Sequence, residues 1–153
     1  MSRAVQTAID SLNFFVESRN AGTVISAVTT ATGGAISADQ FNTAQKGAMF
    51  FITGTSVTAD TTNMTFSINA KDPVTGKYFS YLTAPVVITS TTNQAMILLY
   101  VGAVATTTFV NPNVQAVIDM PLPNVFQITT TLSVTNVSGS GTISYSVDYS
   151  KVM

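Results

Sequence analysis

The sequence contains no cysteine, no histidine and no tryptophan. Without cysteine the chain has no disulfide, no thiolate nucleophile and no zinc-thiolate site. Without histidine it lacks the commonest general base and the commonest metal ligand. A chain of 153 residues does not need such stabilising links, because a domain of this size buries about 70% of the surface that its unfolded chain exposes. We therefore expect a globular domain with no cofactor and no bound metal.

Charged side chains are also scarce. They make up 8% of the chain, whereas an ordinary soluble domain carries about 25%. The net charge is −1, so we expect no basic patch and no binding to nucleic acid or to an anionic membrane. The longest apolar stretch, residues 95–101, is too short to cross a bilayer, which takes about 20 residues.

Threonine, serine, asparagine and glutamine take the place of charge. Threonine suits the solvent face of a strand because it combines a high strand propensity with a hydroxyl group. Such a composition is typical of proteins on particle surfaces or outside cells. The first residues, however, lack the basic flank and apolar core of a signal peptide, so we expect synthesis and folding in a cytoplasm.

The N-terminal residues 1–21 differ from the rest and form a predicted arm or short helix. Apolar residues recur there at spacings of four, three and four: Val5, Ile9, Leu12 and Val16. This spacing predicts one face of a helix that stops near Gly22. The alternative is an extended arm in which Phe14 and Phe15 belong to a strand, since several intervening residues are poor helix formers.

From residue 22 to residue 153 the hydrophobic pattern has a period of two, which predicts a single all-β domain. Alternation is clearest over residues 64–71, 126–135 and 143–150, and it indicates antiparallel strands with one buried face. Residues 48–52 and 96–101 are apolar at every position. They are expected to be central strands of the core or strands with one face against a partner subunit.

Turn-forming residues separate these strands. Asp72-Pro73-Val74-Thr75-Gly76 predicts a tight connection between strands 63–71 and 78–82. Ser138-Gly139-Ser140-Gly141 predicts a hairpin loop between the last two strands. About seven or eight strands at regular intervals are typical of an antiparallel β-sandwich.

The residues do not predict an enzyme. The seven carboxylates are well spread along the sequence: Asp10, Glu17, Asp39, Asp60, Asp72, Asp119 and Asp148. A fold can bring two of them together, as a glycosidase requires, but we interpret them as solvated turn and strand-edge residues. No histidine is present to activate a serine.

One short cluster deserves comparison with carbohydrate-binding sites. Tyr78, Phe79 and Tyr81 follow Lys77, and aromatic rings are the usual platforms for sugars. Strand alternation, however, places Tyr78 on one face and Phe79 and Tyr81 on the other. We therefore interpret these rings as core and interface residues.

Residues 70–78, Ala-Lys-Asp-Pro-Val-Thr-Gly-Lys-Tyr, are followed by Leu82-Thr83 and by a closing strand at 143–149, Ile-Ser-Tyr-Ser-Val-Asp-Tyr. With this turn and closing strand, residues 22–153 resemble a family of small β-sandwich virion proteins of tailed bacteriophages. The resemblance implies a jelly-roll sandwich. It also implies a place among capsid decoration (cement) proteins, which often sit on the shell as trimers, or among head and tail accessory proteins.

The expected function is therefore that of a capsid decoration protein at the capsid surface of a virion. Its expected partners are the major capsid protein and further copies of itself, with a trimer favoured. The arm is expected to extend the contact with a neighbour through five apolar residues: Ile9, Leu12, Phe14, Phe15 and Val16. The alternatives are a tail or head-fibre accessory protein and a module that binds host glycans.

Overall fold

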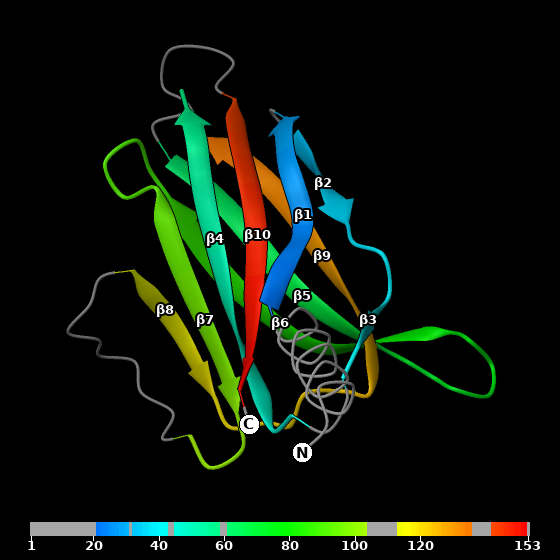
Figure 1. Ribbon diagram of the computed structural model, residues 1–153. Helices are drawn as coiled ribbons and strands as arrows, with labels where there is room; N and C mark the ends of the chain where they lie inside the picture. Colours follow the sequence, from blue (N-terminus) through cyan, green and yellow to red (C-terminus); the bar gives the residue numbers. More distant parts are fainter. Residues whose placement is uncertain are drawn as a thin grey trace, which may run out of the picture.

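The computed structural model describes residues 21–30, 32–42, 45–58, 61–103, 113–135 and 142–152. Within these ranges the chain forms ten strands and no helix. The strands make two sheets of five that pack face to face as a β-sandwich (Figure 1). The predicted arm lies outside the described residues, except that Ala21 already belongs to the first strand. The choice between a helical and an extended arm therefore stays a prediction.

The strands of sheet A, in spatial order, are β1 (Ala21–Thr30), β10 (Ile143–Val152), β4 (Gly47–Val57), β7 (Gln94–Tyr100) and β8 (Val114–Ile118). The strands of sheet B are β2 (Thr32–Ile36), β9 (Val125–Thr135), β5 (Thr61–Lys71) and β6 (Tyr78–Ile88), and β3 (Gln40–Phe41) also pairs with β9. All pairs are antiparallel except β7 with β8, which is parallel. The predicted all-β sandwich is confirmed.

Two features of the prediction were wrong in detail. The described residues form ten strands rather than seven or eight, because β3 has only two residues and β8 was not recognised. Pro112 and Pro121 lie on either side of β8, and because proline cannot donate within a central ladder, such flanks are typical of irregular chain rather than of a strand. The parallel pairing of β8 was also not expected, because antiparallel hairpins are the commoner arrangement in such sandwiches.

The predicted hairpin between the last two strands was also wrong. β9 belongs to sheet B and β10 to sheet A, so the chain passes from one sheet to the other between residues 135 and 143. Glycine and serine mark where a strand ends, but they do not determine which strand the next one pairs with. The last two strands therefore face each other across the core.

The turn between β5 and β6 was predicted correctly. Lys71 lies opposite Tyr78 across the two strands, and the Asp72 N–H donates to the Lys77 carbonyl at 2.8 Å. The Asp72 carboxylate accepts hydrogen bonds from the Val74 N–H at 2.9 Å and the Thr75 hydroxyl at 2.5 Å. Gly76 has a φ of 70°, which favours glycine. These contacts fix a hairpin that extends beyond the sandwich (Figure 1).

The core lies between the two sheets and follows the predicted alternation. Phe50 of β4 and Phe66 of β5 are both fully buried, and their ring centroids are 5.2 Å apart. The inward residues of β9 and β10 are buried as predicted: Phe126, Ile128, Thr130, Leu132, Ile143, Tyr145 and Val147. Both central strands of sheet A, β4 and β7, contribute fully buried residues to this core.

One side of the sandwich is closed by a glutamine. The Gln115 side chain of β8 accepts a hydrogen bond from the Val87 N–H and donates one to the Val87 carbonyl, each at 2.7 Å. Val87 belongs to β6, the last strand of sheet B on this side, and Pro85 lies two residues earlier on the same strand. A side chain of β8 in sheet A is thus hydrogen-bonded to the backbone of β6 in sheet B.

Thr130 is a buried polar residue in the otherwise apolar inner face of β9. Its side chain hydrogen-bonds to the Tyr145 hydroxyl of β10 at 2.6 Å, across the core. The Ala35 N–H of β2 also donates to the Thr130 hydroxyl oxygen at 3.3 Å. This polar interruption of the sequence pattern is therefore explained by partners in both sheets.

Replacing Thr130 with valine should lower the free energy of unfolding by about 1–2 kcal/mol, because the buried Tyr145 hydroxyl loses its partner. Replacing Tyr145 with phenylalanine in the same protein should restore part of the loss, since the unsatisfied hydroxyl is then gone as well. Urea denaturation of the two single variants and the double variant measures the coupling. Strictly additive losses would contradict the proposed hydrogen bond.

Candidate functional site

The outer faces of the two sheets differ in chemistry. The outer face of sheet B carries mainly hydroxyl and amide side chains on its central strands, β5 and β9, with exposed apolar residues at its margins: Ile36, Phe41 and Val87. The Asn69 amide of β5 donates to the Thr129 hydroxyl of β9 at 2.8 Å, and Ser67 and Thr83 lie 3.3 Å apart on neighbouring strands. This face is the threonine-rich solvent surface that the composition predicts.

The outer face of sheet A is apolar over its central strands. Met49 lies opposite Leu98, and Phe51 lies opposite Met96, on β4 and β7. We call these four residues the outer apolar face. Phe51 is 36% exposed, and the other three are partly buried. The inward neighbours Phe50, Ile52, Ile97 and Leu99 are fully buried, which confirms that β4 and β7 are central strands with two apolar faces.

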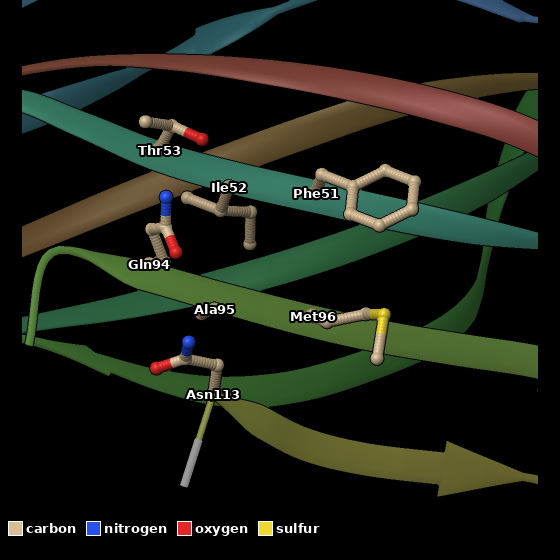
Figure 2. A pocket seen from close by; sticks show the side chains of 7 residues that line it. All are labelled: Phe51, Ile52, Thr53, Gln94, Ala95, Met96 and Asn113. Carbon is tan, nitrogen blue, oxygen red and sulfur yellow. The ribbon is translucent and has the colours of Figure 1, made fainter. Parts of the chain in front are cut away.

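A shallow pocket of about 220 Å³ adjoins the outer apolar face. It lies where β4, β7 and the start of β8 meet, and Figure 2 shows its lining: Phe51, Ile52, Thr53, Gln94, Ala95, Met96 and Asn113. The described residues that line it include amides and a hydroxyl but no titratable side chain. Such a pocket is suited to contact with another surface rather than to proton transfer.

A second hollow, of about 320 Å³, lies at the base of the β5–β6 hairpin. The Lys71 ammonium is 2.5 Å from Asp39 Oδ2, and the Tyr78 hydroxyl donates to Asp39 Oδ1. The Lys71 nitrogen is also 5.3 Å from the centroid of the Tyr78 ring. We call these three residues the Asp39 cluster. Sequence reasoning missed it, because Asp39 and Lys71 are 32 positions apart and no local pattern links them.

Asp39 and Asp72 both line this second hollow. Hydrogen bonds from Lys71 and Tyr78 hold the pKa of Asp39 below its usual value. Hydrogen bonds from the Thr75 hydroxyl and the Val74 N–H do the same for the pKa of Asp72. A glycosidase needs one carboxyl group whose pKa is raised, so that it can donate a proton. Neither of these two carboxyl groups, both stabilised as anions, has the raised pKa of such a proton donor.

The lowered pKa of Asp72 predicts an acid-sensitive hairpin. Its stabilising effect is present above the pKa of an unfolded aspartate, about 3.9, and is lost as the pH falls through the lower pKa of the folded state. Unfolding measured from pH 6 to pH 2 should therefore show a smaller loss of stability on acidification in Asp72→Asn than in the wild type. Thr75→Val, which keeps the carboxylate but removes its main donor, should reduce the loss as well. An unchanged pH dependence in both variants would contradict this role.

The three aromatic residues of the hairpin do not form one platform. Tyr78 shares a cross-strand pair with Lys71, whereas Tyr81 packs against the core, and its hydroxyl donates to the Pro121 carbonyl at 2.7 Å. The predicted opposite orientation of Tyr78 and Tyr81 is thus confirmed. The register of β6 shifts at this point, because Ser80 and Leu82 lie opposite consecutive residues of β5. Phe79 stays 58% exposed.

Within the described ranges no three His, Cys, Asp or Glu side chains gather closely enough to hold a metal ion. That same part of the chain has no helix long and apolar enough to span a membrane. The predicted contact residues of the arm, Ile9, Leu12, Phe14, Phe15 and Val16, lie outside the described residues. No protein-family model, no curated protein and no solved structure matches this chain.

Proposed function

We propose that this chain is a structural virion protein, a bacteriophage capsid decoration (cement) protein that binds and stabilises the major capsid shell. The observation that carries the proposal is the outer apolar face of sheet A, which lies over the central strands β4 and β7, where the central strands of sheet B carry hydroxyl and amide side chains instead. A cement protein acts by contact alone, and burial of apolar surface contributes about 25 cal/mol per Å². Many copies on a shell multiply a modest contact.

The strand pairing supports the finer proposal of a jelly roll. If the short β3 and β8 are set aside, the first of eight strands pairs with the last, the second with the seventh, and so on to the middle: β1–β10, β2–β9, β4–β7 and β5–β6. This is the arrangement of a long hairpin wrapped into two sheets. Jelly rolls are common in viral capsid domains and lectins, so the pairing is compatible with both virion and glycan-binding functions.

We also propose that the protein is not an enzyme and uses no cofactor. The two aspartates beside one hollow both have partners. Asp39 pairs with Lys71, and Asp72 accepts a hydrogen bond from Thr75 of its own turn. The pocket beside the outer apolar face is lined by apolar, amide and hydroxyl groups. Both arrangements support recognition by surface contact.

A shell lattice offers threefold axes, and symmetric closure favours a homo-oligomer, so we propose a trimer at the capsid surface. We also propose that the protein is made in the host cytoplasm and assembles onto a particle, which accounts for its exterior-type composition. The apolar arm residues Ile9, Leu12, Phe14, Phe15 and Val16 are proposed to extend the contact with a neighbouring shell subunit.

Removing residues 1–20 tests the role of the arm. The sandwich should stay folded, because the described strands begin at Ala21, while binding to purified particles that lack the protein should be lost. Circular dichroism measures folding, and co-sedimentation with the particles measures attachment. If the truncated protein decorates the particles as the full chain does, the arm is not the contact.

Counting copies of the protein per virion separates the proposal from its alternatives. A decoration protein should be present in a fixed ratio to the major capsid protein, and particles without it should lose resistance to heat or osmotic shock. A few copies per particle would instead identify a tail or head-fibre component. Saturable binding to host glycans that depends on Tyr78 would identify a glycan-binding module.

A further inference from the structure

A second group of exposed apolar side chains lies at the β5–β6 hairpin. Of the eight large apolar side chains that the described residues leave exposed, four lie on the hairpin or at its base: Phe41, Val74, Tyr78 and Phe79. Val74, in the turn, is 89% exposed. Exposed apolar groups that gather in one place mark sites of interaction. All four belong to the strands or the turn of sheet B, so they are separate from the outer apolar face of sheet A.

The hairpin and the hollow at its base give each copy a projecting part and a recess, side by side. Phe41 and Val125, which lie opposite each other on β3 and β9, line the hollow, and so do Pro73 and Gly76 of the turn. The turn is fixed by the hydrogen bonds of Asp72, and the base of the hairpin by the Asp39 cluster. Both parts are therefore ordered before any contact forms, which lowers the cost of binding.

The direction of the hairpin indicates what it meets. Figure 1 looks onto sheet A, and the hairpin projects to the side of the sandwich rather than toward the viewer. With the outer apolar face of sheet A on the shell, the hairpin would point along the shell surface, where the neighbouring copy lies. To this extent the choice of partner rests on the proposed function.

The charges of the turn and the hollow are complementary. Residues 73–77 of the turn carry one cation, the exposed Lys77, and no anion. The hollow has two carboxylates, Asp39 and Asp72, against one ammonium group, that of Lys71, so its net charge is negative. Opposite charges guide two surfaces together and set their orientation.

We infer that the turn of one copy seats in the hollow of the next copy, with Val74 packed against Phe41 and Val125. Such a contact is heterologous, because it joins two different surfaces, and a series of such contacts can close into a ring. The turn and the hollow adjoin each other on one chain. A rotation axis beside the hairpin therefore brings each turn next to its neighbour's hollow, and a threefold axis fills all three hollows. This assigns a surface to the contact between copies in the proposed trimer.

Light scattering of the full-length protein tests this contact. The wild type should have the mass of three chains, and Val74→Asp should have the mass of one, because the substitution places a carboxylate against the negative hollow. Val101→Asp makes the same change at another exposed valine, which follows β7 in sheet A, and should leave the mass unchanged. A trimeric Val74→Asp would overturn the inference but not the proposed trimer, whereas a monomeric wild type would overturn both. A trimer that Val74→Asp dissociates, but that does not bind particles, would support the inference and contradict the proposed function.

Disulfide formation between co-expressed variants shows which surfaces meet. The chain has no cysteine, so Val74→Cys and Val125→Cys, one of them lengthened by a small tag, can form a mixed disulfide only between chains. Mild oxidation should give this mixed product several-fold faster than it gives the homodimer of either variant. Thr131→Cys in place of Val125→Cys is the control, because Thr131 is exposed on the same strand but does not line the hollow. Mixed disulfide that forms no faster than with this control would overturn the inference.

Discussion

Replacing Phe50 with alanine should lower the free energy of unfolding by about 3–5 kcal/mol. The ring is fully buried on β4 and contacts Phe66 of the opposite sheet, with the two ring centroids 5.2 Å apart. Its removal takes away apolar contacts and leaves a cavity between two sheets that are each held by backbone hydrogen bonds. Because the sheets cannot easily move together, the cavity should stay largely open.

The neighbouring residue provides a matched control. Phe51 has the same side chain on the same strand, but it points to the outer apolar face and is 36% exposed. Phe51→Ala should cost much less, on the order of 1 kcal/mol, because that ring already contacts solvent. Urea denaturation of the two variants measures the difference. Similar losses in both would show that the outer face is as tightly covered as the core.

Replacing Gly47 with alanine should cost about 3 kcal/mol, at the upper end of the effects of overpacking. A Cβ atom at this position would lie 2.0 Å from the Leu99 carbonyl oxygen and 2.8 Å from the Tyr100 Cα. Both are backbone atoms of β7, so neither can move aside by a change of rotamer. The methyl group must push β4 and β7 apart at the end of their pairing, where Gly47 lies opposite Tyr100.

Gly22→Ala is the control for this prediction. Gly22 also lies in a strand of sheet A, but its Cβ would meet only the Tyr149 Cε1 atom at 3.6 Å, an ordinary contact. Its effect should therefore lie between neutral and slightly stabilising, because alanine reduces the freedom of the unfolded chain. Thermal unfolding of both variants measures the contrast. If Gly47→Ala is as stable as Gly22→Ala, the close approach of β4 and β7 is wrong.

The alternating pattern was enough to predict which residues face the core. Phe66 and Ile68 on β5, and Tyr145 and Val147 on β10, are fully or almost fully buried as their spacing predicts. The polar exception, Thr130, occupies an inward position of the same pattern, between Ile128 and Leu132. Side-chain alternation is a local property of an extended chain, so it can be recognised without knowledge of which strands are neighbours.

Strand pairing could not be predicted in this way. β9 and β10 are consecutive in sequence but lie in different sheets, and β1 pairs with β10 at the other end of the chain. Such pairings depend on the packing of the whole domain rather than on the residues of one turn. β8 was missed for the same reason, since its parallel partner β7 stabilises a short segment that flanking prolines indicated as irregular.

The candidate site was predictable in part. Residues 48–52 and 96–101 indicated two strands with apolar side chains on both faces, and these strands provide the outer apolar face. Only the strand register shows that Met49 and Leu98 of this face lie in one row with Ala21 across sheet A. The Asp39 cluster had no local signal, because it depends on the approach of β6 to the segment before β3.

The glutamine that closes one side of the sandwich also limits how copies of this protein can associate. Gln115 occupies both backbone groups of Val87 that point away from β5, and Pro85, two residues earlier on the same edge, has no N–H to donate. An incoming strand would therefore find no ladder to extend along this part of β6. Crowded copies are thus protected here from fibre-like polymerisation.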